Sequence, residues 1–299
     1  MLMTVVSSSG HAPGREGFMM AVTEDTLFGT IGGGTIEKNM VKIARKRLAE
    51  NTSAPEIFHR VHKLSAGKNA SGMICGGTQT IAMHPLGKNA LAILEQCEDS
   101  FLSDHDPKTL RLSFLGIECL NEIRNGSHSF TNFRNSCWFY EETIGQKNTA
   151  YIFGGGHVCL ALSPVLASLG FRIAVLDERP FINTLQENKW CDKLFISPFE
   201  TLPRMIKEGQ NSYAFIMTPS HIHDEMVLRG LLGKNLKYIG MMASKTKVAE
   251  IFANLEKDGF SKEKLKMVHS PIGLSIKSRT PTEIAISIAA EIIQVKNSA

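Results

Sequence analysis

The sequence predicts an α/β protein with two domains: an N-terminal α+β domain followed by a C-terminal doubly wound parallel sheet. Its 299 residues exceed the usual size of a single domain, about 100–200 residues. From Ala150 onward, short apolar runs alternate with segments of helical period, which indicates parallel strands covered by helices on both faces. A glycine-rich segment follows the first of these runs. The predicted domains are residues 1–147 and 148–299.

Composition and charge exclude several classes of protein. Hydrophobic residues make up 43% and charged residues 21%, which is ordinary globular usage and excludes a disordered or fibrous chain. The net charge of +4 is small and spread along the chain, so neither a nucleic acid nor a membrane is an expected partner. The first ten residues lack the basic start and long apolar core of a signal peptide, so we expect a cytoplasmic protein.

The first domain is predicted to mix short strands with helices. A hairpin turn at Glu24-Asp25 joins two strands, and a glycine-rich loop leads from the second of them into an amphipathic helix. Two more strands and a second helix follow, and the stretch 99–147 is predicted to add further strands and a linker. The expected strands are 18–22, 26–29, 57–64 and 73–83, and the expected helices are 35–50 and 88–98.

The second domain is predicted to alternate strands with helices throughout. Its last helix follows Pro281, a residue well suited to a helix start. The expected strands are 150–153, 172–176, 193–196, 213–217 and 237–240. The expected helices are 157–169, 199–207, 223–232, 245–257 and 282–294.

The segment Gly154-Gly155-Gly156-His157 joins the first strand of this domain to its first helix, which is where the dinucleotide-binding fingerprint occurs. Glycines there permit a tight turn and let a pyrophosphate approach the helix N-terminus. Cys159 replaces the third glycine of the fingerprint as a small packing residue. Asp177 ends the next strand, where it is placed to accept hydrogen bonds from a ribose. A Rossmann-like domain with a nucleotide or phosphate-bearing ligand is therefore predicted; the alternative is a glycine-rich turn that binds nothing.

Two further loops follow predicted strands and precede helices, at the edge of the sheet where such folds bind ligands. In the first, His221 is a candidate metal ligand or proton carrier; the alternative is that Ser220 or Asp224 caps the helix and the histidines are merely exposed. In the second, Ser244 precedes two lysines whose position in a first helical turn indicates an anion nearby. Ordinary capping by Ser244 with solvated lysines is the alternative.

The first domain carries two glycine motifs of its own. Cys75-Gly76-Gly77 places a thiol before two glycines, which makes its sulfur accessible as a soft-metal ligand or sulfur acceptor. A buried structural cysteine is the alternative. The six cysteines include no CxxC pair, so zinc and thioredoxin-like sites are not predicted. Gly32-Gly33-Gly34 predicts a second anion cradle, but without the lysine of a nucleoside triphosphatase loop.

In their order along the chain, these segments resemble the XdhC/CoxI family of xanthine dehydrogenase accessory proteins. That family has an N-terminal GTIGGG-x-x-E segment, matched by residues 29–34 with Glu37, and a CGG segment, matched at Cys75. Its Rossmann-like half is matched over residues 154–158, 177–180, 218–224, 238–247 and 271–281.

The resemblance implies a non-enzymatic carrier that binds molybdenum cofactor (molybdopterin), aids its sulfuration and delivers it to a xanthine dehydrogenase-type apoenzyme. It implies that Cys75 binds the cofactor as a molybdenum ligand. The glycine loops of both domains suit the anionic phosphate of the pterin, and NAD(P) is a further expected ligand of the Rossmann-like half. A cysteine desulfurase is a second expected partner, and a homodimer is the expected oligomer.

Two other functions are compatible with the motifs. An NAD(P)-dependent oxidoreductase would use Gly154, Gly156 and Asp177 for the cofactor and His221 as acid and base, although the sequence shows no Arg–His pair that would clamp a 2-hydroxyacid substrate. A nucleotide-sensing regulatory module would leave Cys75 without a purpose.

Overall fold

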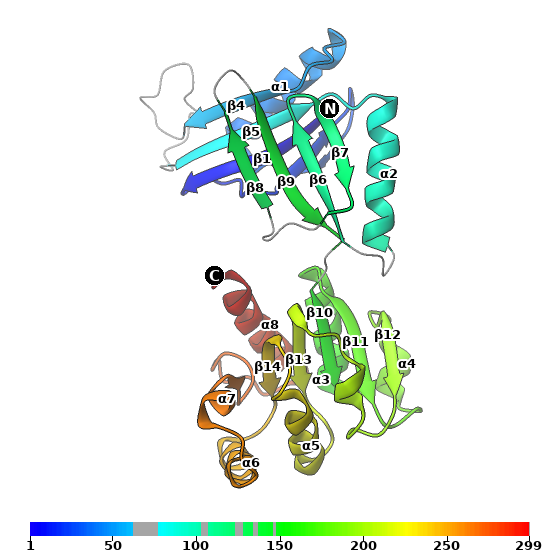
Figure 1. Cartoon of the computed structure of the whole chain (residues 1–299), viewed down its shortest axis with the longest axis vertical. Helices are drawn as coiled ribbons and strands as arrows, with labels where there is room; N and C mark the ends of the chain where they lie inside the picture. The colour runs from blue at the N-terminus through cyan, green and yellow to red at the C-terminus, as the bar shows by residue number, and fades with distance from the viewer. Residues whose placement is uncertain (62–76, 103–106, 123–127, 134–136, 146–147, 299) are drawn as a thin grey trace. The chain divides into compact units, whose positions relative to one another are not determined.

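A computed structural model describes residues 1–61, 77–102, 107–122, 128–133, 137–145 and 148–298. The chain divides into two compact units, Met1–Gln146 and Lys147–Ala299, which we call unit 1 and unit 2. Unit 1 is built on antiparallel sheets and unit 2 on a parallel sheet (Figure 1). In the described residues no helix is long and apolar enough to cross a membrane.

The first sheet of unit 1 has five antiparallel strands in the order β3-β2-β1-β5-β4. The hairpin predicted around Glu24-Asp25 is confirmed, since its two strands pair from Met20–Gly29 to Val22–Leu27. The central strand, whose first five residues are buried, was not predicted. The strands are β1 (Leu2–Gly10), β2 (Met19–Val22), β3 (Leu27–Gly29), β4 (Glu56–Val61) and β5 (Gly77–His84).

Burial on both faces explains why the central strand lacks an alternating pattern. Met3 and Val5 face the core under helix α1 (Gly34–Ala49), whereas Leu2 and Val6 face a core shared with the second sheet. A strand covered on both sides is apolar at consecutive positions, so it shows no period of two.

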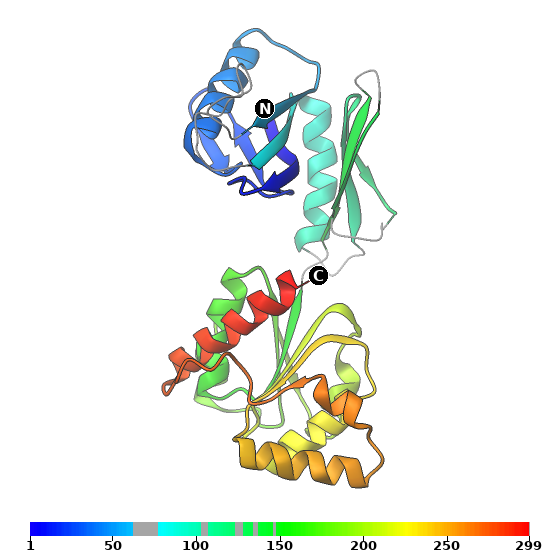
Figure 2. The ribbon, with the colours of Figure 1, turned by 90° about the vertical axis from the view of Figure 1, so that its left-hand side faces the viewer.

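The second sheet lies in the stretch predicted to hold strands and a linker. Its order is β7-β6-β9-β8, and helix α2 (Lys88–Leu102) packs against it (Figure 2). Trp138, Tyr140 and Leu112 are buried in its core with Cys97 of α2. The strands are β6 (Lys108–Ser113), β7 (Gly116–Leu120), β8 (His128–Asn132) and β9 (Trp138–Ile144).

Unit 2 contains a six-stranded parallel sheet in the order β12-β11-β10-β13-β14-β15. β11 and β12 lie on one side of β10, and β13, β14 and β15 lie on the other, as in a Rossmann sheet. The strands are β10 (Thr149–Phe153), β11 (Arg172–Asp177), β12 (Lys193–Ile196), β13 (Gly209–Ile216), β14 (Leu236–Met241) and β15 (Val268–His269).

Helices cover both faces of this sheet, as predicted. Ala150 and Ile152 of β10 pack with helices α3 (His157–Ser168) and α8 (Pro281–Asn297). The alternate residues Tyr151 and Phe153 pack with α5 (His221–Leu231) and α6 (Lys245–Lys257). Two short helices, α4 (Asn183–Glu187) and α7 (Lys262–Lys266), were not predicted.

The helix predicted over 199–207 is wrong. The segment forms only the 3-10 helix η2 (Leu202–Met205). Pro203 lies within that turn and has no backbone N–H to continue a helical ladder. Phe199 and Leu202 are nevertheless fully buried, and their spacing imitated the apolar stripe of a longer helix.

Candidate functional site

The predicted glycine loop of unit 2 lies at the point where the strand order reverses. β10 pairs in parallel with β11 on one side and with β13 on the other. Gly154 has φ +107°, and a Cβ atom there would overlap the carbonyl oxygen of Met217, just after β13. Glycine is therefore required at this position, because the loop touches the neighbouring backbone.

The next two glycines differ in their surroundings. A Cβ atom on Gly155 would collide with the side chain of Leu185, whereas one on Gly156 would meet no atom within 4 Å. Gly156 is the N-cap of α3 and provides no side chain to cap it, and His157 begins the helix as an exposed residue. The backbone is thus packed at Gly154 and Gly155 and open at Gly156.

Asp177 has a different environment from the one the sequence suggested. Its side chain is 0% exposed. One carboxylate oxygen accepts hydrogen bonds from Gly155 N (2.7 Å) and Arg179 Nη2 (2.8 Å), and the other from Arg179 N and Nε (both 2.9 Å). Burial alone would raise the pKa of Asp177, but these hydrogen bonds outweigh it and lower the pKa. Asp177 is therefore a buried anion that anchors the glycine loop and Arg179, and its hydrogen bond to a ribose stays a prediction.

The loop after β13 is organised by capping. Ser220 accepts a hydrogen bond from His223 N at 3.3 Å and so caps α5, while a metal-binding or proton-carrying role for His221 stays a prediction. Asp224 accepts from both Thr218 N (3.1 Å) and Thr218 Oγ1 (2.6 Å), and its burial raises its pKa. His223 is half-buried, and its Nδ1 lies 3.9 Å from a carboxylate oxygen of Glu178.

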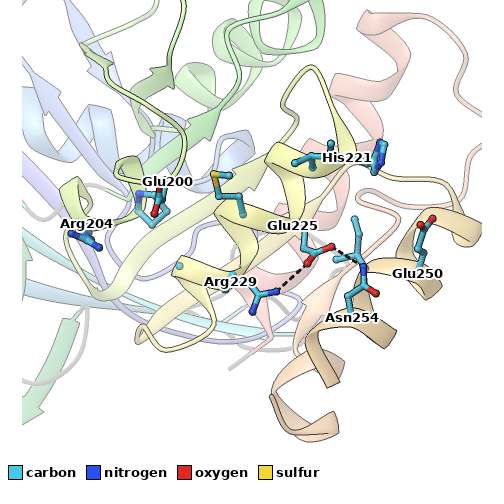
Figure 3. A pocket seen from close by; sticks show the side chains of 12 residues that line it. Glu200, Arg204, His221, Glu225, Arg229, Glu250 and Asn254 are labelled. Atoms are coloured by element: carbon cyan, nitrogen blue, oxygen red, sulfur yellow. Dashed lines mark hydrogen bonds and ion pairs between the residues drawn. The ribbon is translucent and has the colours of Figure 1, made fainter. Parts of the chain in front are cut away.

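His221 is an exposed residue at the start of α5 and lines a groove of about 670 Å³ (Figure 3). The groove runs between α5, α6 and η2, and none of its lining residues belongs to the glycine loop. Glu225 of α5 accepts hydrogen bonds from Arg229 on the same helix and from Asn254 on α6. The lining residues are Glu200, Pro203, Arg204, His221, Ile222, Glu225, Met226, Arg229, Gly230, Glu250, Ile251 and Asn254.

Ser244 is the N-cap of α6 and accepts a hydrogen bond from Lys247 N at 3.4 Å. The capping by Ser244 that the sequence allows is thus present. Lys245 and Lys247 are exposed in the first turn, as the sequence predicts. Binding of an anion by this loop stays a prediction.

In unit 1, the predicted anion cradle already contains a carboxylate of the chain itself. Glu37 of α1 accepts hydrogen bonds through one oxygen from Thr30 Oγ1 (2.6 Å), Ile31 N (2.9 Å) and Gly33 N (3.0 Å). Gly32, Gly33 and Gly34 all have positive φ, which is why the loop is glycine-rich. A ligand phosphate would have to displace Glu37 to reach these two N–H groups.

Three separate segments meet beside this loop. A Cβ atom on Gly14 would overlap the carbonyl oxygen of Ile31, and one on Gly77 would lie only 2.6 Å from that of Ser9. Gln79 is 1% exposed, donates to Ile31 O at 2.7 Å, and has a buried side-chain oxygen without a partner in the structure. We call this junction of residues 9–14, 31–33 and 77–79 the unit 1 loop junction.

The loop junction adjoins the predicted thiol site along the chain. Cys75 and Gly76 lie outside the described residues, and Gly77 is the first residue of β5. Among the described cysteines, Cys97 and Cys159 are buried, and burial raises the pKa of each thiol to about 12. These two thiols are therefore poor nucleophiles and ligands, and the packing role predicted for Cys159 is confirmed. The described residues contain no group of three or more His, Cys, Asp or Glu that could hold a metal ion.

The roles of Arg179 and Gln79 were not predicted, and neither were the hydrogen bonds of Glu37 to the glycine loop. For Arg179 a signal existed, since an arginine two residues after a strand-ending acid can turn back to it. For Gln79 none existed, because its partner Ile31 is 48 residues away.

The fold places the chain among two-unit α/β proteins whose second unit is a Rossmann-type domain. Two models of one family match it in order: the XdhC and CoxI family over residues 1–61, and the XdhC Rossmann domain over residues 150–292. The chain belongs to the XdhC and CoxI family, which confirms the predicted resemblance.

Individual relatives agree with this assignment. The chain is 26% identical over 296 residues to the Escherichia coli K12 uncharacterized protein YqeB, covering 99% of this chain and 43% of that protein. It is 27% identical over 165 residues to a probable xanthine dehydrogenase subunit from Bacillus subtilis, covering 55% of this chain and 48% of that protein. The chain therefore spans less than half the length of each of these curated relatives.

A crystal structure described as a xanthine dehydrogenase from Bacillus halodurans shares the fold. The TM-score is 0.75 at 24% identity, and the superposition covers 99% of this chain and 91% of that one.

Proposed function

We propose that this chain acts as an accessory protein in the maturation of a xanthine dehydrogenase-type molybdenum hydroxylase. In this role it binds molybdenum cofactor, aids its sulfuration and helps insert it into the apoenzyme. The observation that supports the proposal best is the unit 1 loop junction, which holds Gly77 against Ser9 and Ala12, two residues after Cys75. Membership of the XdhC and CoxI family supports the same role.

The residues of unit 1 fit such a cofactor chemically. Molybdenum is thiophilic, so a thiolate at Cys75 is a suitable ligand. The unpartnered side-chain oxygen of Gln79 is a buried acceptor at the same junction. When bound, the cofactor supplies the molybdenum centre that the hydroxylase uses.

Unit 2 is proposed to bind a different ligand from unit 1. The open backbone at Gly156 and the packed turn at Gly154 are features of a dinucleotide site, so we assign it a dinucleotide such as NAD(P). The proposed partners are the hydroxylase apoenzyme and a cysteine desulfurase, in the cytoplasm, with the chain acting as a homodimer.

The test is to purify the full chain from molybdate-fed cells and to measure molybdenum and released pterin per chain. Wild type is expected to retain both, and Cys75→Ala is expected to lose most of each. Cys137→Ala is the matched control, because Cys137 is a described, half-buried cysteine of the same unit outside the loop junction. Equal retention by wild type and Cys75→Ala would contradict the role of Cys75.

The same purified protein also tests the alternative function, an NAD(P)-dependent oxidoreductase. That function requires NAD(P)H turnover that depends on His221 and is independent of Cys75. The loop that leads to His221 begins at Met217, whose backbone touches Gly154 of the glycine loop, so this turnover measurement decides between the two functions.

A further inference from the structure

Arg179 lies where Rossmann domains discriminate between dinucleotides. In these domains the residue that ends the second strand of the sheet accepts hydrogen bonds from the adenine ribose, and an arginine nearby accommodates a phosphate on that ribose instead. Asp177 occupies the acceptor position here, at the end of β11. If Asp177 faces the ligand, an unmodified ribose is expected. If Arg179 faces it, a ribose that carries a phosphate is expected.

The carboxylate of Asp177 has no free acceptor to offer. Its side chain is wholly buried, and each of its oxygens already accepts two hydrogen bonds, from Gly155 and Arg179. A ribose hydroxyl could reach it only if these bonds broke. Breaking them would leave a buried anion without its partner and would release Gly155 of the glycine loop. The structure thus disfavours an unmodified ribose at this position.

Arg179, in contrast, presents a cation. Its guanidinium donates through Nε and Nη2 to Asp177, and its side chain remains 39% exposed. An arginine has five N–H donors in a rigid fork, so pairing along one edge leaves the donors of Nη1 for another acceptor. The pair with Asp177 also holds the guanidinium in place before a ligand arrives, which reduces the entropy lost on binding.

Glu178, the acidic neighbour of Arg179, is partly exposed, and besides the hydrogen bonds to Asp177 its negative charge helps to raise the pKa of Arg179. Glu178 approaches His223 Nδ1 on α5, at 3.9 Å. The negative charge of Glu178 therefore lies beside a histidine.

We propose that unit 2 selects a dinucleotide that carries a phosphate on its adenine ribose, of the NADP(H) type, over NAD(H), and that Arg179 is the residue that determines this preference. This inference rests on the dinucleotide site proposed for unit 2. It is independent of Cys75 and of the molybdenum cofactor.

The test is calorimetric titration of the full chain with NADP⁺ and NAD⁺, and with adenosine 2′,5′-bisphosphate, adenosine 3′,5′-bisphosphate and adenosine 5′-phosphate. A charge-assisted arginine–phosphate contact is expected to favour NADP⁺ over NAD⁺ by about ten- to a hundredfold. The 2′,5′-bisphosphate is expected to bind more tightly than the 5′-phosphate, and the 3′ isomer shows whether the position of the phosphate matters.

Two variants assign the preference to the residue. Arg179→Ala is expected to reduce the NADP⁺ to NAD⁺ ratio to near unity, and Arg179→Lys to restore part of it. Glu178→Gln is the matched control: it removes a negative charge beside Arg179, so the preference for NADP⁺ is expected to be kept or to rise. Circular dichroism checks that each variant is folded, and the ratio measured on wild type does not depend on any variant.

The outcomes separate the two proposals. Equal or tighter binding of NAD⁺ by wild type, or an unchanged ratio in folded Arg179→Ala, would overturn the inference and leave the dinucleotide site standing. Failure of all five compounds to bind would overturn both the inference and the dinucleotide site. Neither result affects the molybdenum and pterin measurement on Cys75.

Discussion

Three side chains, Asp177, Glu37 and His84, show how the surroundings of a residue determine its role. Asp177 and Glu37 follow or flank glycine loops in the sequence, where each is compatible with ligand binding, yet both accept hydrogen bonds from their own loops. His84 ends β5 in the core of unit 1, at 1% exposure, with its Nε2 3.0 Å from Ser113 O. Its Nδ1 is buried without a partner in the structure. Burial can therefore reverse what a residue type suggests.

We expect His84 to make the stability of unit 1 sensitive to pH. Burial lowers the pKa of His84 from 6.5 to about 4, and the hydrogen bond with Ser113 offsets this only in part. The unfolded chain therefore binds a proton at His84 more tightly than the folded chain does. The contribution of neutral His84 to stability is complete above about pH 6.5 and is lost as the pH falls toward 4. We expect the loss from this residue to be about 1.4 kcal/mol per pH unit within that window.

The measurement is chemical unfolding of wild type and His84→Gln between pH 7.5 and pH 4.5. Glutamine can still donate to Ser113 O but does not titrate, so the variant is expected to lose less stability on acidification. His11→Gln, which removes an exposed histidine of the same unit, is the control. Parallel pH curves for wild type and His84→Gln would show that His84 is not the cause.

At the scale of elements, helix α1 and the glycine loop before it are joined by hydrogen bonds. Gly33 is the N-cap of α1 but has no side chain to cap it, and Glu37 from the first turn reaches back to the loop instead. Burial alone would raise the pKa of Glu37, but the hydrogen bonds from Thr30, Ile31 and Gly33 lower it. The carboxylate thus replaces a capping side chain and a bound anion.

We therefore expect Glu37→Gln to lower the free energy of unfolding at pH 7 by about 1–2 kcal/mol, since it removes charge-assisted hydrogen bonds. Because the pKa of Glu37 is lowered on folding, its contribution is present above the unfolded pKa and disappears as the pH falls through the folded one. The gap between variant and wild type is expected to shrink at pH 3.

Denaturant titrations at both pH values test this. Glu50→Gln is the matched control, because Glu50 forms only an exposed pair with Lys46 at 3.7 Å and its loss is expected to cost less than about 0.5 kcal/mol. A variant as stable as wild type at pH 7 would mean that the cradle does not need the charge.

The elements themselves were predictable where their signals are local. The strand–helix alternation of unit 2, the hairpin β2–β3 and the last helix all follow from periodicity, glycines and Pro281. Prediction failed at β1, buried on both faces, and at 199–207, where two buried residues around a proline imitated a helix. In both cases the burial of the segment depends on elements far away in the chain.

For the whole molecule, the two units have separate cores. The buried clusters of unit 2 lie on the two faces of its own parallel sheet, and those of unit 1 lie under α1 and between its two sheets. A domain with its own core can fold alone. Residues 147–299 are therefore expected to form a stable fragment.

This fragment is expected to unfold in one cooperative thermal transition and to bind NADP⁺ as the full chain does, but to retain neither molybdenum nor pterin. Calorimetry and the titration above measure the first two properties. The full-length chain purified in parallel is the control. An aggregated fragment, or one that unfolds without a cooperative transition, would show that unit 2 depends on unit 1.

The family, the α/β class and the positions of the glycine loops follow from the order of residues alone, because periodicity and the need for positive φ are properties of short segments. What those loops contact depends on the folded chain. Folding places the carboxylate of Glu37 in the glycine loop of unit 1 and pairs Asp177 with Arg179. It also brings residues 9–14 and 77–79 together. The reason is physical: a carboxylate can bind any donor within reach, and which donor it finds depends on how the backbone folds around it.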